Sequence, residues 1–282
     1  MNDKLVRNIS DTAMWVAHYR AAETERPDAI FKDPFARALA GDRGRQIAKA
    51  QKFGDQNAWS FMARTVLFDR FVTEVVREGV DTVVNLAAGL DTRPYRIDLP
   101  KALRWIEVDL PGILDYKEEI IGSAAPVCAL ERVRLDLSDE SARRALFARI
   151  GATSSRTAVM TEGLLIYLDA PQVESLARDL AGVASFRTWI IDLVSPGLIK
   201  MMMQRGGDMV AAAGAPFKFA PPEGPPFFEG LGWHPGETAS LLKTAGRLNR
   251  LPLFLKLISL LPESPRRKPE RPWSAVIRLE RT

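Results

Sequence analysis

The stretch from Asp81 to Arg93 constrains the fold of this chain more than any other. It begins with a short apolar run, 83–86, which is too brief for a helix. Small residues follow at 87–89, and Asp91 and Thr92 can then cap a helix. The pattern predicts a buried strand, a tight turn and a helix start. Small residues let the backbone approach a ligand, and the free N–H groups of a helix start are donors, so a ligand cradle is expected here.

Acidic residues end the predicted strands that follow. Asp109 stands twenty positions after Gly89, which is the spacing of an acidic residue that binds a ribose diol through two carboxylate oxygens. Asp136 ends the next predicted strand, where an adenine amino group could donate to it. Glu162 ends the strand after that. These tips are expected to line one edge of a sheet.

Predicted strands and helices alternate through most of the chain, which indicates a parallel sheet covered by helices on both faces. Residues 1–79 are predicted to form a helical extension that caps the site, and residues 80–282 to form the α/β core. The predicted strands are 81–86, 104–109, 131–136, 157–162 and 187–194, and the helices that follow them are 92–97, 112–122, 138–150, 171–184 and 197–213.

The last third of the chain holds less regular sequence. The stretch 216–228 contains five prolines and four phenylalanines and is predicted to be a stiff apolar loop, either a surface connector or a lid inserted near 214–234. A helix is predicted over 235–245 and a closing strand over 273–279. The apolar segment 251–261 is too short to span a membrane. It is predicted to be a core or cap helix, with an apolar substrate wall or a dimer face as alternatives.

The composition limits the partners and the compartment. The net charge of +4 is spread along the chain, which gives no basis for a nucleic-acid partner, and we expect no membrane partner; a homodimer is left open. The single Cys128 suits a reducing cytosol, and no apolar signal-peptide core follows Met1, so a cytoplasmic location is expected. With only His18 and His234 besides Cys128, we expect no metal site.

Several short motifs in a fixed order point to a known family. With them the chain resembles the leucine carboxyl methyltransferase family, which includes polyketide O-methyltransferases, from about residue 10 to the C-terminus. The resemblance implies the class I S-adenosylmethionine-dependent methyltransferase fold, a Rossmann-like, seven-stranded, mostly parallel sheet whose last strand is antiparallel. The motifs lie at 12–17, 20–23, 33–36, 64–65, 88–96, 107–111 and 161–168.

The resemblance also implies roles for single residues. Arg64 would pair with the methionine carboxylate of the cofactor, which suits a guanidinium that binds with two N–H groups. Gly89 would allow close approach, and Asp109 would hold the ribose, with Leu110 beside the adenine. Asp136 and Leu137 would bind the adenine edge. Glu162 would face the methionine amino group or the methyl-transfer channel. The implied cofactor-binding residues are Arg64, Ala88, Gly89, Asp91, Asp109, Leu110, Asp136, Leu137 and Glu162.

One position departs from the family pattern. The family commonly has glycine where this chain has Ala87, and alanine suits such a turn when its φ is negative.

Methyl transfer from a sulfonium requires mainly the alignment of nucleophile and methyl group. A carboxylate acceptor is ionised at pH 7 and needs no base, whereas a phenol or alcohol gains from one. His18, Tyr19, Tyr167 and His234 are the candidates, and the sequence singles out none of them. The catalytic residue is therefore left unassigned.

The sequence thus predicts an S-adenosylmethionine-dependent O-methyltransferase that acts on a carboxyl or phenolic oxygen of a small, largely apolar, polyketide-like molecule of secondary metabolism. Three alternatives are open. A nicotinamide-dependent oxidoreductase would use a similar acidic strand tip, but the turn lacks the third glycine of that fingerprint. The others are a cofactor-binding module without turnover and a methyltransferase acting on the C-terminal carboxyl group of a protein.

Overall fold

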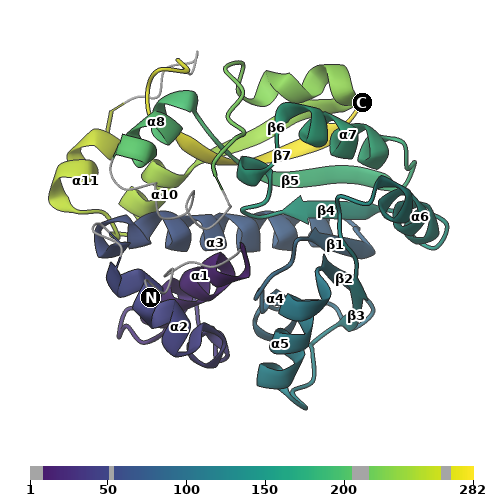
Figure 1. Cartoon of the computed structure of the whole chain (residues 1–282), viewed down its shortest axis with the longest axis horizontal. Helices are drawn as coiled ribbons and strands as arrows, with labels where there is room; N and C mark the ends of the chain where they lie inside the picture. Colours follow the sequence, from purple (N-terminus) through teal and green to yellow (C-terminus); the bar gives the residue numbers. More distant parts are fainter. Residues whose placement is uncertain (1–8, 51–53, 205–215, 262–267) are drawn as a thin grey trace, which may run out of the picture.

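A seven-stranded sheet forms the centre of the molecule (Figure 1). The structure is a computed structural model and describes residues 9–50, 54–204, 216–261 and 268–282. The strands lie in the order β3-β2-β1-β4-β5-β7-β6, and β7 runs antiparallel to both of its neighbours while β1 to β5 are parallel. The predicted α/β sheet with an antiparallel last strand is confirmed. The strands are β1 Thr82–Leu86, β2 Arg104–Asp109, β3 Ala129–Arg134, β4 Thr157–Thr161, β5 Phe186–Val194, β6 Trp233–Ser240 and β7 Ser274–Arg281.

Helices cover both faces of the sheet, because successive strand residues point to opposite sides. In β1, Val84 packs with helices α6 and α7, whereas Val83 packs with α3 and α10 on the other face. Every residue of β1 and of β4 is buried, as expected for strands inside a parallel sheet. The helices after β1 are α4 Arg93–Arg96, α5 Pro111–Ile121, α6 Glu140–Gly151, α7 Ala170–Ala181, α8 Pro196–Gln204 and α10 Leu241–Arg247.

Three helices precede the sheet: α1 Ile9–Thr24, α2 Ala36–Ala50 and α3 Gly54–Arg77. Helix α3 shares a hydrophobic core with the sheet, where Phe68 and Phe71 pack with Trp105. Helices α1 and α2 pack on each other and form a smaller cluster with Leu90 and Ile113 of the β1 turn and α5. The N-terminal helices therefore reach the sheet edge at which the predicted ligand cradle lies.

The proline- and phenylalanine-rich stretch 216–228 is partly core. Phe219 and Phe228 are buried, and Phe228 lies edge-on to Trp189 of β5. The 3₁₀ helix η2, Pro225–Leu231, begins within this stretch and ends just before β6. The stretch is not a simple surface connector, because two of its phenylalanines are buried. It is not only a lid either, because only residues 216–218 reach the cavity described below.

The helix predicted over 235–245 is wrong in its first half. Residues up to Ser240 form β6, which pairs with β7, and α10 begins only at Leu241, where the Ser240 hydroxyl accepts a hydrogen bond from Lys243 N. The backbone N–H and C=O groups of this segment form hydrogen bonds with β7, which a short sequence window cannot show. These hydrogen bonds stabilise the strand although the residues of the segment have weak strand propensity.

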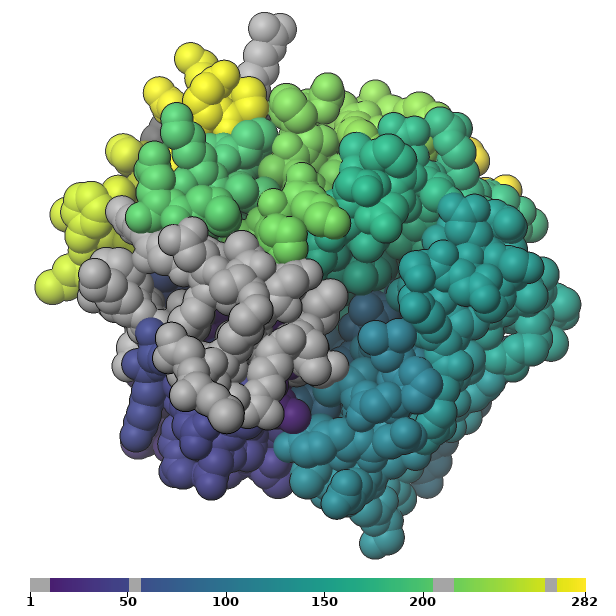
Figure 2. Space-filling view, in the orientation of Figure 1, coloured from purple at the N-terminus to yellow at the C-terminus, as the bar shows by residue number. Residues whose placement is uncertain are grey.

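Helix α11, Leu253–Ser259, lies within the apolar segment 251–261 but does not belong to the core. Its side chains Leu253, Phe254 and Leu257 are 85%, 71% and 70% exposed. The helix stands out at one edge of the molecule (Figure 2). The interpretation as a core helix was therefore wrong. Within the described residues, no helix is both long enough and apolar enough to cross a bilayer.

Candidate active site

A cavity of about 660 Å³ lies at the carboxyl ends of β1, β2, β4 and β5, which is where open α/β sheets bind ligands. Helices α1 and α3 and residues 216–218 complete its walls. All nine residues predicted from the sequence to bind the cofactor line this one cavity: Arg64, Ala88, Gly89, Asp91, Asp109, Leu110, Asp136, Leu137 and Glu162. Their individual roles stay predictions.

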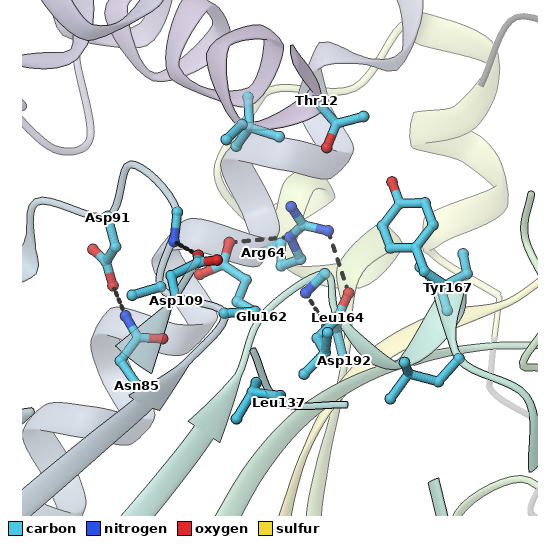
Figure 3. A pocket seen from close by; sticks show the side chains of 18 of the residues that line it. Thr12, Arg64, Asn85, Asp91, Asp109, Leu137, Glu162, Leu164, Tyr167 and Asp192 are labelled. Atoms are coloured by element: carbon cyan, nitrogen blue, oxygen red, sulfur yellow. Dashed lines mark hydrogen bonds and ion pairs between the residues drawn. The ribbon is translucent and has the colours of Figure 1, made fainter. Parts of the chain in front are cut away.

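Arg64 of α3 lies between two carboxylates at the floor of the cavity (Figure 3). Its Nε donates to Glu162 Oε1 at 3.1 Å, and its Nη1 donates to Asp192 Oδ2 at 3.2 Å. These charges raise the pKa of Arg64 although burial alone would lower it, and the guanidinium stays charged. No described residue accepts a hydrogen bond from Nη2, so this donor is available to an anion in the cavity. The donor set therefore fits an amino acid carboxylate.

The backbone of the turn after β4 is shaped to admit this guanidinium. Gly163 has a φ of +69°, and a Cβ added there would lie 3.4 Å from Arg64 Nη1. Its N–H donates to Asp192 Oδ1 at 2.7 Å. A side chain at this position would be strained and would press on Arg64.

Asp192 is a site residue that the sequence analysis missed. It sits in β5 among apolar neighbours, and burial raises its pKa, with Arg64 opposing the shift. The available signal was a charged residue inside an apolar strand, because such residues are rarely buried without a partner. What the sequence could not supply was the partner, since Arg64 stands 128 positions away.

A second guanidinium joins the site to the turn after β1. Arg93, which is almost fully buried, binds Glu162 Oε2 at 2.9 Å and Asp91 Oδ2 at 2.8 Å through Nη1, and Asp69 Oδ1 at 2.7 Å through Nε. Asn85 also donates to Asp91. Burial alone would raise the pKa of Asp91, but the Arg93 charge lowers it to about 2. Asp91 is therefore held by the protein itself, and its carboxylate fixes the shape of the cradle.

Asp109 closes the other side of the cradle. Its Oδ2 accepts from Gly89 N at 2.6 Å and its Oδ1 from Leu110 N at 2.7 Å, which leaves a lone pair on each oxygen for ribose hydroxyls. Burial raises its pKa despite these bonds. Asp136 follows β3 by two residues and accepts from Ser138 N, so it lies in a turn and not at the strand end that the sequence predicted.

We expect Asp109→Ala to weaken binding of S-adenosylhomocysteine by roughly 1–3 kcal/mol, because hydrogen bonds to a charged group are lost. Asp109→Asn should be milder, since one acceptor oxygen remains. Only the ionised carboxylate accepts from both hydroxyls, so affinity should fall as pH drops, starting above the pKa of an ordinary aspartate. Calorimetric titration of both variants and of the exposed control Asp115→Ala tests this. An unchanged dissociation constant for Asp109→Ala would contradict the ribose assignment.

Ala87 adopts a φ of +53°, a left-handed conformation that disfavours residues with a Cβ. Alanine was expected to suit this turn only with a negative φ, and Ala87 does not have one. We expect Ala87→Gly to stabilise the fold by roughly 0.5–1 kcal/mol, since relief of strain exceeds the added entropy of the unfolded chain. The neighbouring Ala88, which has no positive φ, supplies the control: Ala88→Gly should destabilise. Urea unfolding measures the free energy of unfolding of both variants. A lower stability of both would refute the strain argument.

The N-terminal helices are fastened directly to the cradle. Arg20 of α1 donates to Leu90 O at 2.6 Å and to Asp33 Oδ2 at 2.8 Å. The Thr92 hydroxyl donates to the same Asp33 oxygen at 2.7 Å. These bonds link α1, the α1–α2 connection and the turn after β1 into one wall of the cavity.

The part of the cavity beyond Arg64 is mainly apolar. Figure 3 shows Tyr167 on the side of Arg64 away from Asp109, with Thr12 above it. Burial raises the pKa of Tyr167, with Arg64 and a hydrogen bond to Thr12 opposing the shift. Other side chains around this part come from α1, α8 and residues 216–217, namely Trp15, Val16, Leu198, Met202, Pro216 and Phe217.

The four candidate bases lie in different parts of the structure. Tyr167 lines the cavity, whereas His18, Tyr19 and His234 are not among its lining residues. Tyr19 borders a smaller pocket between α1 and α3, and His234 lies exposed on β6. Of the four, only Tyr167 is placed to contact an acceptor.

The strand order, the single reversed strand and the cavity at the ends of the parallel strands define a class I methyltransferase fold. The crystal structure of a DUF574-family protein from Streptomyces avermitilis is similar, with a TM-score of 0.63 at 13% identity over 99% of both chains, which concerns the fold alone. Residues 13–181 match the sequence profile of leucine carboxyl methyltransferases. The chain belongs to the leucine carboxyl methyltransferase family.

Two relatives carry provisional names as S-adenosyl-L-methionine-dependent methyltransferases. One, from Frankia alni, is 31% identical over 251 residues, which cover 85% of this chain and 87% of the relative. The other, from Rhodococcus jostii, is 36% identical over 189 residues. That match covers 64% of this chain and 64% of the relative, so the alignment spans just under two-thirds of the Rhodococcus protein. S-adenosylmethionine is accordingly the cofactor to test against the site.

Proposed function

We propose that this protein is an S-adenosylmethionine-dependent O-methyltransferase that acts on a small, largely apolar molecule. The observation that carries the proposal is the single cavity in which all nine predicted cofactor residues meet an apolar compartment. Its volume of about 660 Å³ falls within the range of small-molecule sites. When bound, S-adenosylmethionine supplies a methyl group already activated by its sulfonium.

The residues of the chain would bind and orient the two reactants. Arg64 would hold the methionine carboxylate through Nη2, and the Glu162 and Asp192 carboxylates beside it would attract the methionine ammonium. Asp109 would hold the ribose. The apolar walls near Tyr167 would exclude water and align the acceptor, which is the main requirement of this reaction.

A carboxyl oxygen is the acceptor that this lining supports best. Each carboxylate around the cavity already accepts a hydrogen bond or pairs with an arginine, as Glu162 does with Arg64 and Arg93. No histidine occurs among the described residues that line the cavity, and the raised pKa of Tyr167 keeps its hydroxyl protonated at neutral pH. A carboxylic acid arrives ionised and needs no base. Tyr167 would then donate a hydrogen bond to the acceptor.

Two experiments test the proposal. S-adenosylmethionine or S-adenosylhomocysteine should raise the thermal stability, because a ligand of the folded state alone stabilises it, whereas NAD should not. Labelled cofactor incubated with extracts of the source organism should give a labelled small molecule whose methyl group is released by mild alkali, as an ester requires. A label resistant to alkali would indicate an ether, and a label on protein would indicate a protein carboxyl methyltransferase. A shift with NAD alone would overturn the methyltransferase assignment.

A further inference from the structure

Helix α11 exposes an apolar face to solvent. Four large side chains at its exposed side, Leu253, Phe254, Leu257 and Leu260, are at least 70% exposed. The smaller Ser259 faces the protein, where its Oγ would lie 2.5 Å from a Cβ added at Gly246. Isolated exposed leucines need no explanation, but a contiguous apolar face of this kind marks an interaction surface.

Basic residues dominate the sequence around the same helix. Among the described residues between 243 and 272, six lysines and arginines stand against one acidic residue, Glu270, although the excess in the whole chain is only four. Lys256 lies on α11 itself, and the exposed Arg247 ends α10 just before it. Neither forms an ion pair with a described carboxylate; Arg250 does, with Glu23 and Asp28.

We propose that α11 is a docking surface for an anionic lipid bilayer. The seven-residue helix would lie in the plane of the membrane interface and bury its exposed apolar side chains at the boundary between headgroups and acyl chains, as interfacial helices do. Basic residues beside that face would attract anionic headgroups, with roughly a fivefold gain in affinity for each. One short helix gives reversible docking and no permanent anchor.

The surrounding charge favours a membrane over a second copy of the chain. A two-fold dimer through α11 would bring two surfaces with the same excess of positive charge against each other, and the repulsion of like charges would oppose it. The sequence-based expectation of no membrane partner rested on the lack of a spanning segment, which a surface-binding helix does not need. The proposal is independent of the proposed methyl transfer.

Vesicle flotation tests the proposal, with phosphatidylcholine vesicles that do or do not contain one third phosphatidylglycerol. The protein should float with the anionic vesicles and bind less as salt rises. The variant Leu253→Ser/Phe254→Ser/Leu257→Ser should bind about tenfold more weakly or worse, and Lys256→Gln/Arg247→Gln roughly twenty-five-fold more weakly, fivefold for each basic residue. All replaced side chains are exposed, so thermal unfolding should not change.

The matched controls lie away from α11. Val127→Ser removes a side chain that is 38% exposed, and Lys101→Gln removes an exposed charge; neither should alter flotation. Failure of the folded protein to bind anionic vesicles, or equal binding by the triple-serine variant, would overturn the proposal. A dimer in analytical ultracentrifugation that the triple variant dissociates, together with no flotation, would instead identify α11 as an interface between copies.

Discussion

Arg93→Met is expected to destabilise the protein by about 3–5 kcal/mol at pH 7, the range for removing one partner of a buried ion pair. Arg93 is nearly fully buried against Asp69, Asp91 and Glu162. After the substitution Asp69 keeps Arg96 and Glu162 keeps Arg64, so Asp91 alone loses its cation. Methionine fills much of the volume, so the loss should come mainly from the uncompensated carboxylate.

The pH dependence separates this charge effect from a packing effect. In the native protein the lowered pKa of Asp91, about 2, contributes stability that is present above its unfolded pKa and is lost as pH falls through 2. Without Arg93, burial raises the pKa of Asp91, and the variant gains stability as pH drops and the carboxyl protonates. The difference between the two proteins in urea unfolding should therefore be smaller at pH 4.5 than at pH 7.

Two further variants complete this test. Adding Asp91→Asn to Arg93→Met should recover part of the lost stability, because the buried charge is removed with its partner. The control Arg70→Met breaks a partly exposed pair between Arg70 of α3 and Glu237 of β6 and should cost less than about 1 kcal/mol. A destabilisation by Arg93→Met that is equal at both pH values, with no recovery in the double variant, would show that packing and not charge is responsible.

Arg64→Met is expected to weaken binding of S-adenosylhomocysteine roughly a hundredfold, about 3 kcal/mol, the upper range for hydrogen bonds to a charged group. The substitution removes the Nη2 donor assigned to the amino acid carboxylate and leaves Asp192 with Gly163 N as its donor. The affinity of Arg64→Lys for S-adenosylhomocysteine should lie between those of the unmodified protein and Arg64→Met, since lysine retains the charge but not the planar set of donors. Isothermal titration calorimetry measures all three.

A truncated ligand provides the control. 5′-Methylthioadenosine has the adenosine and the thioether but no amino acid carboxylate, so Arg64→Met should scarcely change its affinity. If both ligands lose affinity equally, Arg64 acts by holding the cavity in shape through Glu162 and Asp192 and not by contacting the carboxylate.

The cradle could be predicted from the sequence because its signals are local. A short apolar run, small residues and an acidic residue at a set spacing lie within one strand–turn–helix unit and the strand after it, and Gly89 and Asp109 indeed meet at 2.6 Å. The alternation of strands and helices likewise follows from short windows. These features depend on backbone chemistry that each segment carries with it.

The ion-pair network could not be predicted in the same way. The sequence analysis placed Arg93 in a motif but did not predict its ion pairs. Its contact with Asp69 depends on how α3 lies across the sheet, which the sequence does not show. The strand β6 was missed because its own sequence has weak strand propensity, and its pairing with β7 cannot be seen in a short window around it. Apolar composition correctly indicated the helix α11 but could not show whether its apolar face points inward, which depends on its neighbours.

The attachment of α1 to the cradle has a thermodynamic consequence. Because Arg20 bonds to Leu90 and Asp33, the cavity keeps its shape only while α1 stays in place. Local opening of α1 should then release a bound ligand, and by thermodynamic linkage a bound ligand must shift the equilibrium of α1 toward the closed state. At a concentration one hundred times the dissociation constant, the protection would amount to about 2.7 kcal/mol. Hydrogen exchange at the amides of α1 would thus report the fraction of the protein that has ligand bound, and no signal from the ligand itself would be needed.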